Sequence, residues 1–126
     1  MIETKLFFQR FGNNLLSGDL SWVAAQCNIP VAAYFDAELL VAKTQNELMS
    51  LLQKRRNKFA AEGITKMCIR NIEERIHPDN RISVTIDWDF FDHMGQPIGE
   101  STTRFFCAPT DQGLRLLIME RPARDE

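Results

Sequence analysis

The hydrophobic positions of this chain change their spacing near Gly63, from a helical repeat to a two-residue alternation. Before that point, apolar residues recur every three or four positions over residues 3–17, which predicts an amphipathic helix. The segment ends at LLSG, where Gly18 is placed to supply the left-handed residue that closes a helix. Asp19 then stands at a helix N-cap position, and we expect a short helix after it that ends before Pro30.

The next segment, PVAAYFDAELLVAKT at residues 30–44, predicts two short strands folded about residues 35–37. TQNE, residues 44–47, has the pattern of a capping box, in which Thr44 accepts from the N3 amide and Glu47 reaches back to the cap. Apolar residues at helical spacing continue to Phe59, and Gly63 ends the pattern. We therefore predict a long helix from Thr44 to Gly63.

Four alternating segments follow, at residues 64–77, 81–92, 97–109 and 113–121. The turn-forming sequences HPDN, DHMGQP and PTDQG separate them. The pattern predicts four antiparallel strands connected as a meander. Helices in the first half and strands in the second favour the α+β class, with the helices covering one face of a curved sheet.

The second strand of the meander contains TIDWDFFDHMG, residues 85–95, where three aspartates and a histidine lie close together in the sequence. Alternation divides this strand between two faces. We assign one face to the core or a pocket: Ile82, Val84, Ile86, Trp88 and Phe90. The opposite face holds Ser83, Thr85, Asp87, Asp89 and Phe91.

The aspartates therefore have a structural interpretation. Asp87 and Asp89 are expected to point outward, where arginines on neighbouring strands can pair with them; the candidates are Arg70, Arg75 and Arg104. Asp92 to Gly95 is expected to form the turn that ends the strand, with positive φ at the glycine.

Composition limits the class of protein and its partners. A chain of 126 residues with 44% hydrophobic and 25% charged residues is typical of one soluble globular domain, here residues 1–126. The net charge of −2 argues against nucleic acid as a partner, because phosphate binding requires a basic excess. KRRNK, residues 54–58, spans more than one side of the long helix and is interpreted as a solvated face. The N-terminal residues show no signal peptide or membrane span, so we expect no membrane partner and a cytoplasmic location.

The order of elements resembles the nuclear-transport-factor-2-like superfamily, in its small bacterial branch of SnoaL-like proteins, which are similar to polyketide cyclases and ketosteroid isomerases. The matching segments are QRFGNNLLSGDLSWVAA at residues 9–25, the helix from Thr44 to Gly63, and WDFFDHMGQPIGESTTRFF followed by GLRLLIME. The resemblance implies a cystatin-like cone, in which a strongly curved, mixed and mostly antiparallel sheet wraps around three helices of the N-terminal half. It also implies a pocket at the wide end and frequently a homodimer through the outer face of the sheet.

Members of this superfamily differ in activity, so the chemistry depends on individual residues. The isomerase branch uses a tyrosine on the first helix, and the resemblance places Phe11 there, which has no hydroxyl and disfavours steroid isomerisation. The base position falls at Phe35 or Asp36. The candidate catalytic residues of a lyase or isomerase acting on a carbonyl compound are Tyr34, Asp36 and Arg104.

Histidines and cysteines offer little further chemistry. His77 and His93 flank a strand that spans roughly 40 Å when extended, so they cannot share a site within one chain. A histidine metal centre is thereby disfavoured, and we expect neither a metal nor another cofactor. Asp92 with His93 stays open as a dyad at the pocket rim. Three cysteines without a CxxC pair indicate reduced, mostly buried thiols: Cys27, Cys68 and Cys107.

The remaining pocket is largely apolar. Its candidate ligand-binding residues are Phe11, Trp22, Tyr34, Trp88, Phe106 and Met119. A bulge in the hairpin 81–92/97–109 would shift its register, so the pattern leaves open whether Arg104 or Phe105 faces the pocket. Glu74 and Arg70 are expected to form an ion pair, either inside the pocket or in solvent.

The sequence thus predicts a domain that binds a small, mainly hydrophobic ligand in the cone. Two alternatives stay open: a lyase or isomerase acting on a carbonyl-containing small molecule, and a non-catalytic dimerisation or assembly domain.

Overall fold

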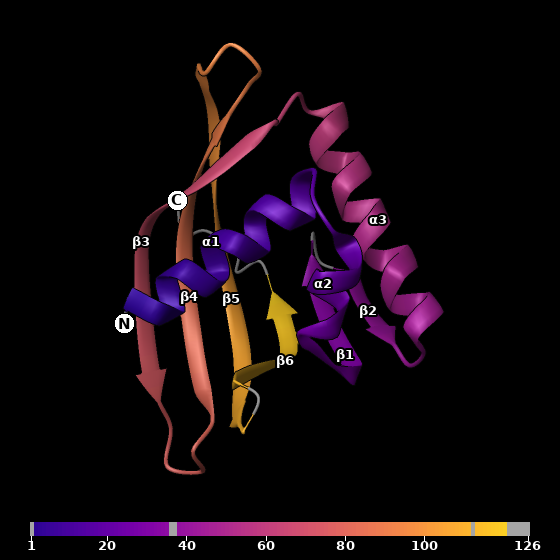
Figure 1. The fold of residues 1–126 in the computed structure, drawn as a ribbon, viewed down its shortest axis with the longest axis vertical. Helices are drawn as coiled ribbons and strands as arrows, with labels where there is room; N and C mark the ends of the chain where they lie inside the picture. Colours follow the sequence, from indigo (N-terminus) through magenta and orange to yellow (C-terminus); the bar gives the residue numbers. More distant parts are fainter. Residues whose placement is uncertain (1, 36–37, 112, 121–126) are drawn as a thin grey trace.

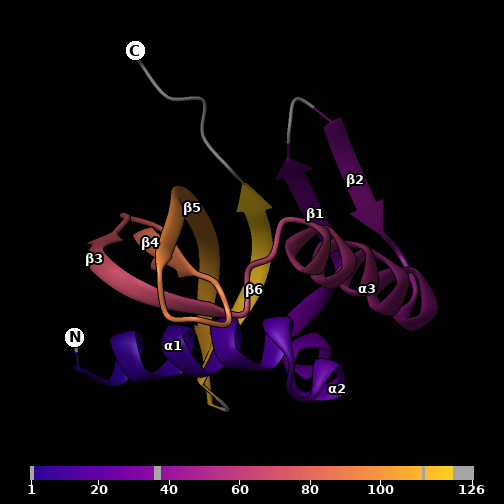
Figure 2. The same ribbon diagram turned by 90° about the horizontal axis from the view of Figure 1, so that it is seen from above.

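The structure, a computed structural model, describes residues 2–35, 38–111 and 113–120 of the chain. Its helices are α1 (Ile2–Leu16), α2 (Leu20–Ala25) and α3 (Gln45–Ala61). Its strands are β1 (Cys27–Phe35), β2 (Glu38–Ala42), β3 (Lys66–Ile76), β4 (Ile82–Phe91), β5 (Pro97–Thr110) and β6 (Gly113–Glu120). Figures 1 and 2 show the helices together on one side of a sheet that curves around them. The predicted α+β class is confirmed.

The six strands form one mixed sheet in the order β2-β1-β6-β5-β4-β3. Strands β3 to β6 are the predicted antiparallel meander, and β1 with β2 is the predicted hairpin. The hairpin joins the meander because β1 pairs parallel to β6. Strand β1 also begins at Cys27, ahead of the predicted start at Pro30. Alternation within a segment cannot indicate this long-range pairing.

Side-chain caps define the starts of α2 and α3. The Asp19 carboxylate accepts from the amides of Ser21 (2.9 Å) and Trp22 (3.3 Å). At α3, Thr44 Oγ1 accepts from the Glu47 amide at 3.1 Å, as the capping box predicts. The Glu47 carboxylate reaches one residue further back and accepts from the Lys43 amide at 2.9 Å. Both predicted helix starts are therefore confirmed.

Gly18 does not have the predicted left-handed conformation, so this prediction is wrong. The glycines with positive φ are Gly63, Gly95 and Gly113, and Gly18 is not among them. A Cβ at Gly18 would instead lie 2.2 Å from Asn14 Oδ1. The Asn14 side chain folds back over this position and accepts from the Asp19 amide at 3.1 Å, and the added Cβ would also lie 2.9 Å from the backbone Cα of Asn14, so the close backbone approach favours glycine.

Two arginines bind the carbonyls at the ends of helices. The Arg56 guanidinium donates to the carbonyl oxygens of Leu15 (2.9 Å), Asn14 (2.6 Å) and Gly18 (2.8 Å), which joins α3 to the end of α1. Arg115 of β6 donates in the same way to the carbonyl oxygens of Ala25, the last residue of α2, and of Cys27. A cation is favoured there by the helix dipole. The KRRNK interpretation is therefore wrong for Arg56, which is half-buried and structural.

The buried face of β4 is the one that alternation predicts. Val84, Ile86, Trp88 and Phe90 all point into the core beneath the helices. The closest approach is at Gly12 of α1, where an added Cβ would lie 3.0 Å from two ring carbons of Trp88 and 3.2 Å from Met67 Cγ. The backbone of α1 therefore rests directly on the indole of Trp88.

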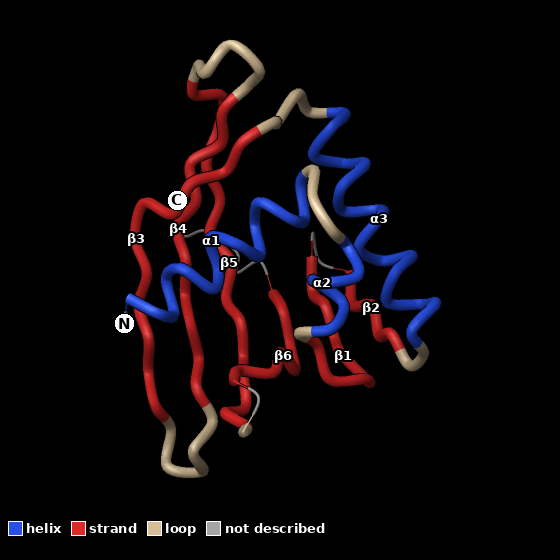
Figure 3. The backbone as a smooth tube through the Cα atoms, viewed as in Figure 1, coloured by secondary structure: helices blue, strands red, loops and turns tan. Residues whose placement is uncertain are grey.

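The outward aspartates and the turn also follow the prediction. Asp87 accepts from the Thr102 hydroxyl at 2.7 Å, and Asp89 forms an ion pair with Arg70 at 3.1 Å. Asp92 accepts from the amides of Met94 and Gln96, each at 2.9 Å, and Gly95 has a φ of 77°. The acidic stretch is therefore a strand and a turn. Figure 3 shows this turn and the β3–β4 turn at opposite ends of the sheet, which separates His93 from His77.

The Gly12 contact generates a stability prediction. Gly12→Ala should lower the free energy of unfolding by about 1–2 kcal/mol, because overpacking against Trp88 exceeds the gain in helix propensity. Urea unfolding followed by circular dichroism measures the change. Gly99→Ala is the control, because its Cβ would contact only Phe90, at 3.9 Å. A Gly12→Ala protein as stable as the wild type would contradict the packing described.

Candidate functional site

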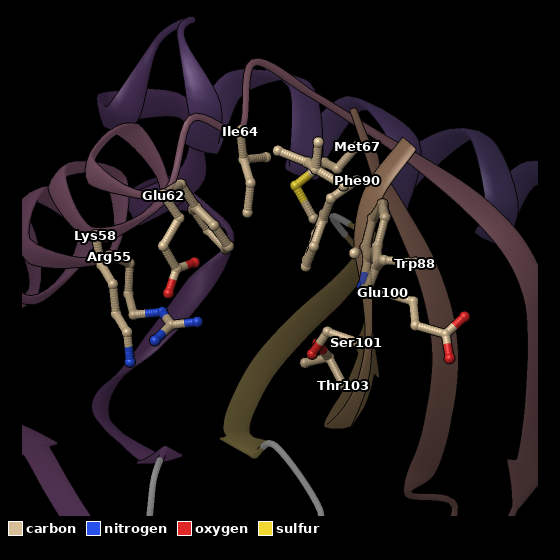
Figure 4. A pocket seen from close by; sticks show the side chains of 13 residues that line it. Arg55, Lys58, Glu62, Ile64, Met67, Trp88, Phe90, Glu100, Ser101 and Thr103 are labelled. Atoms are coloured by element: carbon tan, nitrogen blue, oxygen red, sulfur yellow. The ribbon is translucent and has the colours of Figure 1, made fainter. Parts of the chain in front are cut away.

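A cavity of about 290 Å³ opens between the C-terminal half of α3 and the paired strands β4 and β5. Figure 4 shows Arg55 and Lys58 of α3 on one side, with Trp88 and the β5 side chains Ser101 and Thr103 on the other. The complete lining is Arg55, Lys58, Phe59, Glu62, Ile64, Met67, Trp88, Phe90, Ile98, Gly99, Glu100, Ser101 and Thr103. The lining therefore combines charged side chains, the hydroxyls of Ser101 and Thr103, and apolar side chains.

A smaller cavity of about 40 Å³ continues inward from the first. The two share five lining residues: Arg55, Phe59, Met67, Trp88 and Thr103. The inner cavity adds only apolar side chains, namely Phe11, Leu15, Leu51, Leu52, Phe105 and Met119. Within this lining, as far as the structure describes it, Arg55 is the one ionisable residue. The site is thus an apolar recess behind a polar mouth.

The space exists because of small residues on the inner face of β5. In the β4–β5 register, Gly99 lies opposite Phe90, Ser101 opposite Trp88, and Thr103 opposite Ile86. Each large residue of β4 therefore has a small neighbour. Further along β5 the inner position is Phe105, whose ring packs against those of Phe8 and Phe11 and closes the cone.

On the β4–β5 wall of this site, three hydrogen-bonding groups have no partner among the described residues. They are the Trp88 indole Nε1–H and the hydroxyls of Ser101 and Thr103. Trp88 is only 1% exposed and Ser101 only 7%. No described polar side-chain atom that is sealed from solvent lacks a partner, so these groups open onto the cavity. Polar groups that face a cavity and have no protein partner can bond to a ligand, which makes this cluster a candidate for ligand contact.

The structure places three predicted pocket residues around the inner cavity: Phe11, Trp88 and Met119. Trp22 and Tyr34 line neither cavity, so the structure does not support their prediction as pocket residues. Trp22 is half-buried, with its ring against Phe7 and the Arg10 guanidinium 4.3 Å above it. Tyr34 is exposed on the outer face, because inner and outer positions alternate along β1 and Ala33 takes the buried one.

The open question of register is settled by the β4–β5 pairing. Arg104 lies opposite Thr85 on the outer face, and its guanidinium pairs with Glu120 at 2.9 Å. Phe105 is therefore the inward residue, and the prediction of Phe106 as a pocket residue is wrong. Arg104 and Phe106 instead line an open groove of about 700 Å³ on the outer side of β3–β5.

The remaining candidate groups do not converge. Asp36 lies outside the described residues. The expected pair of Glu74 with Arg70 does not form, because the register shift between Ile69 and Asn71 changes the alternation of β3. Glu74 accepts instead from the Thr4 hydroxyl at 3.2 Å. His93 is exposed in its turn, and Asp92 beside it binds backbone amides.

The described residues contain neither a metal-binding cluster nor a membrane-spanning helix. No group of three or more histidine, cysteine, aspartate or glutamate side chains there is placed to hold a metal ion. No described helix is both long and apolar enough to cross a membrane.

The cysteines behave as core residues. Burial raises the pKa of the Cys27 thiol to about 12, and nearby Arg115 offsets this only in part. Burial also raises the pKa of Cys107 to about 12, with smaller contributions from Glu74 and Cys27. Cys68 is half-buried, and all three thiols are free. The prediction that the thiols are mostly buried is confirmed.

Sequence reasoning missed Arg55, Ser101 and Thr103 as site residues. Arg55 lies in the run KRRNK, which is predicted to be a solvated face, but it also falls in the helical repeat of inward positions, one turn before the buried Phe59. The alternation of Gly99, Ser101 and Thr103 carried the other signal, since small residues at every second position of an inner face leave space. Their face could be assigned only once the hairpin register was known.

Structural comparison identifies the fold. ActVI-ORFA from Streptomyces coelicolor has a TM-score of 0.74 at 16% identity, over 96% of this chain and 94% of that chain. Aln2 from a Streptomyces species has a TM-score of 0.73 at 13% identity, over 95% and 89%. A nuclear-transport-factor-2-like protein with a cystatin-like fold, from Novosphingobium aromaticivorans, has a TM-score of 0.72 at 16% identity, over 98% and 80%. No protein-family model and no curated protein sequence matches the chain. Identities this low show a shared fold and not a shared activity.

The thiol environments generate a reactivity prediction. At pH 8, Ellman's reagent should modify one thiol of the native protein and three after denaturation, because thiols with a pKa near 12 stay protonated and unreactive. Cys68→Ser should remove the native reaction. Rapid modification of two or more thiols in the native protein would contradict the burial of Cys27 and Cys107.

Proposed function

We propose that this chain, which has the nuclear-transport-factor-2-like, cystatin-like fold, binds a small and mainly hydrophobic ligand between α3 and the β4–β5 pair. The observation that carries the proposal is the cluster of unpaired groups formed by Trp88, Ser101 and Thr103. They lie where the apolar recess meets the polar mouth. An apolar pocket with a few convergent polar groups is the usual form of a small-molecule site.

Binding fits these residues better than catalysis does. The described lining of the inner cavity contains no carboxylate, imidazole, phenol or thiol, and its Arg55 cannot serve as a general base at neutral pH. Of the catalytic candidates, Tyr34 and Arg104 lie on the outer face of the sheet, away from the cavity. A lyase or isomerase would need a base from outside this lining.

Blocking the cavity tests the proposal. Propylbenzene should bind to the wild type, and Thr103→Met should weaken binding at least tenfold, because its side chain fills the junction of the two cavities. Thr102→Met is the control, since Thr102 lies on the outer face opposite Asp87. Nuclear magnetic resonance titration measures the affinities. Equal binding to both variants would place the ligand elsewhere and overturn the proposal.

A second proposal concerns the outer face of the sheet, which we infer forms a homodimer. Two rows of paired residues cross β2, β1, β6 and β5 there. One row is Val41, Ala32, Ile118 and Phe106, and the other is Leu39, Tyr34, Glu120 and Arg104. The large apolar members Val41, Ile118, Leu39 and Tyr34 have exposed fractions from 40% to 61%. Contiguous exposed apolar residues on a sheet favour association with a second copy.

Light scattering tests the dimer. The wild type should have twice the mass of the chain at micromolar concentration, and Ile118→Asp should give a monomer, because it places a charge in the row formed by Val41, Ala32, Ile118 and Phe106. Leu6→Asp is the control, because Leu6 is exposed on α1, on the helical side. A monomeric wild type, or a dimer that Ile118→Asp leaves intact, would contradict this interface.

A further inference from the structure

The junction of the two cavities carries an excess of hydrogen-bond donors. Trp88 Nε1–H can only donate, and the hydroxyls of Ser101 and Thr103 donate as well as accept. All three lack partners among the described residues. Arg55 lines both cavities, and a guanidinium has five N–H groups, so it can contact a ligand while keeping its contacts within the protein.

The number of donors indicates which acceptor group of a ligand would fit the site. One carbonyl oxygen accepts about two hydrogen bonds, whereas a carboxylate accepts about four. Three unpaired donors beside a cation therefore exceed what a single carbonyl oxygen can satisfy. A hydroxyl would satisfy the indole but would add one more donor.

The positions of the charged residues are also consistent with a carboxylate as the acceptor. The five residues shared by the two cavities include one cation, Arg55, and no anion. Glu62 and Glu100 line only the outer cavity, where Lys58 accompanies them. An anionic group at the junction, next to Trp88 and Thr103, would lie beside this cation and apart from the two carboxylates. Its uncharged part can then occupy the inner recess, where every lining side chain that is not shared is apolar.

We propose that the ligand is a small monocarboxylic acid, whose carboxylate accepts hydrogen bonds from Trp88, Ser101 and Thr103 beside Arg55 while its hydrocarbon chain fills the recess. This inference rests on the proposed ligand-binding function and names the chemical class of the ligand. The combined volume of the two cavities is at the lower end of the range for small-molecule sites, so the hydrocarbon chain of the ligand should be short.

The test compares hexanoate with hexanamide, which keeps the carbonyl and the chain but lacks the charge. Trp22→Phe leaves Trp88 as the only tryptophan, so its indole N–H gives a single resonance. Hexanoate at pH 7 should shift this resonance downfield and bind at least tenfold more tightly than hexanamide. In the same background, Thr103→Val and Ser101→Ala should each weaken hexanoate binding about tenfold. Thr102→Val is the matched control on the outer face and should leave it unchanged.

The ways in which this test can fail are distinguishable. Equal binding of hexanoate and hexanamide at the Trp88 resonance would overturn the carboxylate inference and leave the proposed binding function standing. Tight hexanoate binding that Thr103→Val and Ser101→Ala do not weaken would also overturn it. If hexanoate, hexanamide and propylbenzene all leave the Trp88 resonance unchanged, the proposed function itself fails.

Discussion

The contact between Gly12 and Trp88 determines how the helices lie on the sheet. A side chain at position 12 would be within 3.0 Å of the indole, so α1 can lie this close to β4 only through a glycine. Arg56 then joins the end of α1 to α3, which makes the position of α3 depend on the same contact. Because the cavity lies between α3 and β4–β5, its width follows from how closely α1 packs on Trp88.

Trp88 therefore has two roles. Its ring is part of the core, and it is nearly inaccessible. Its Nε1–H faces the cavity without a described partner, beside the hydroxyls of Ser101 and Thr103. Because this N–H opens onto the cavity and is not sealed from solvent, a ligand with a suitably placed oxygen can accept its hydrogen bond. The polar side of the site is thus built on rigid strands, while the apolar recess is lined by side chains of α1, α3 and the sheet.

Local patterns predicted most of the fold. Alternation assigned the inner face of β4 correctly, and Asp19 and Thr44 marked helix starts that the structure confirms. Interactions between distant segments were not predictable in this way. The parallel pairing of β1 with β6 and the contacts of Arg56 with α1 join residues far apart in the chain. The residues of the site could not be assigned from the sequence because they depend on the β4–β5 register. This register turns Phe105 inward and Phe106 outward, and it brings Ser101 and Thr103 to the cavity.

A crystal structure of the protein soaked with hexanoate would decide where a ligand binds, because it locates both ends of the molecule. We expect a carboxylate oxygen within about 2.7–3.2 Å of Trp88 Nε1, with contacts to Ser101 or Thr103 and the carbon chain in the recess lined by Phe11 and Met119. Electron density for the ligand outside this cavity, or a Trp88 Nε1–H that donates to another protein group, would contradict it.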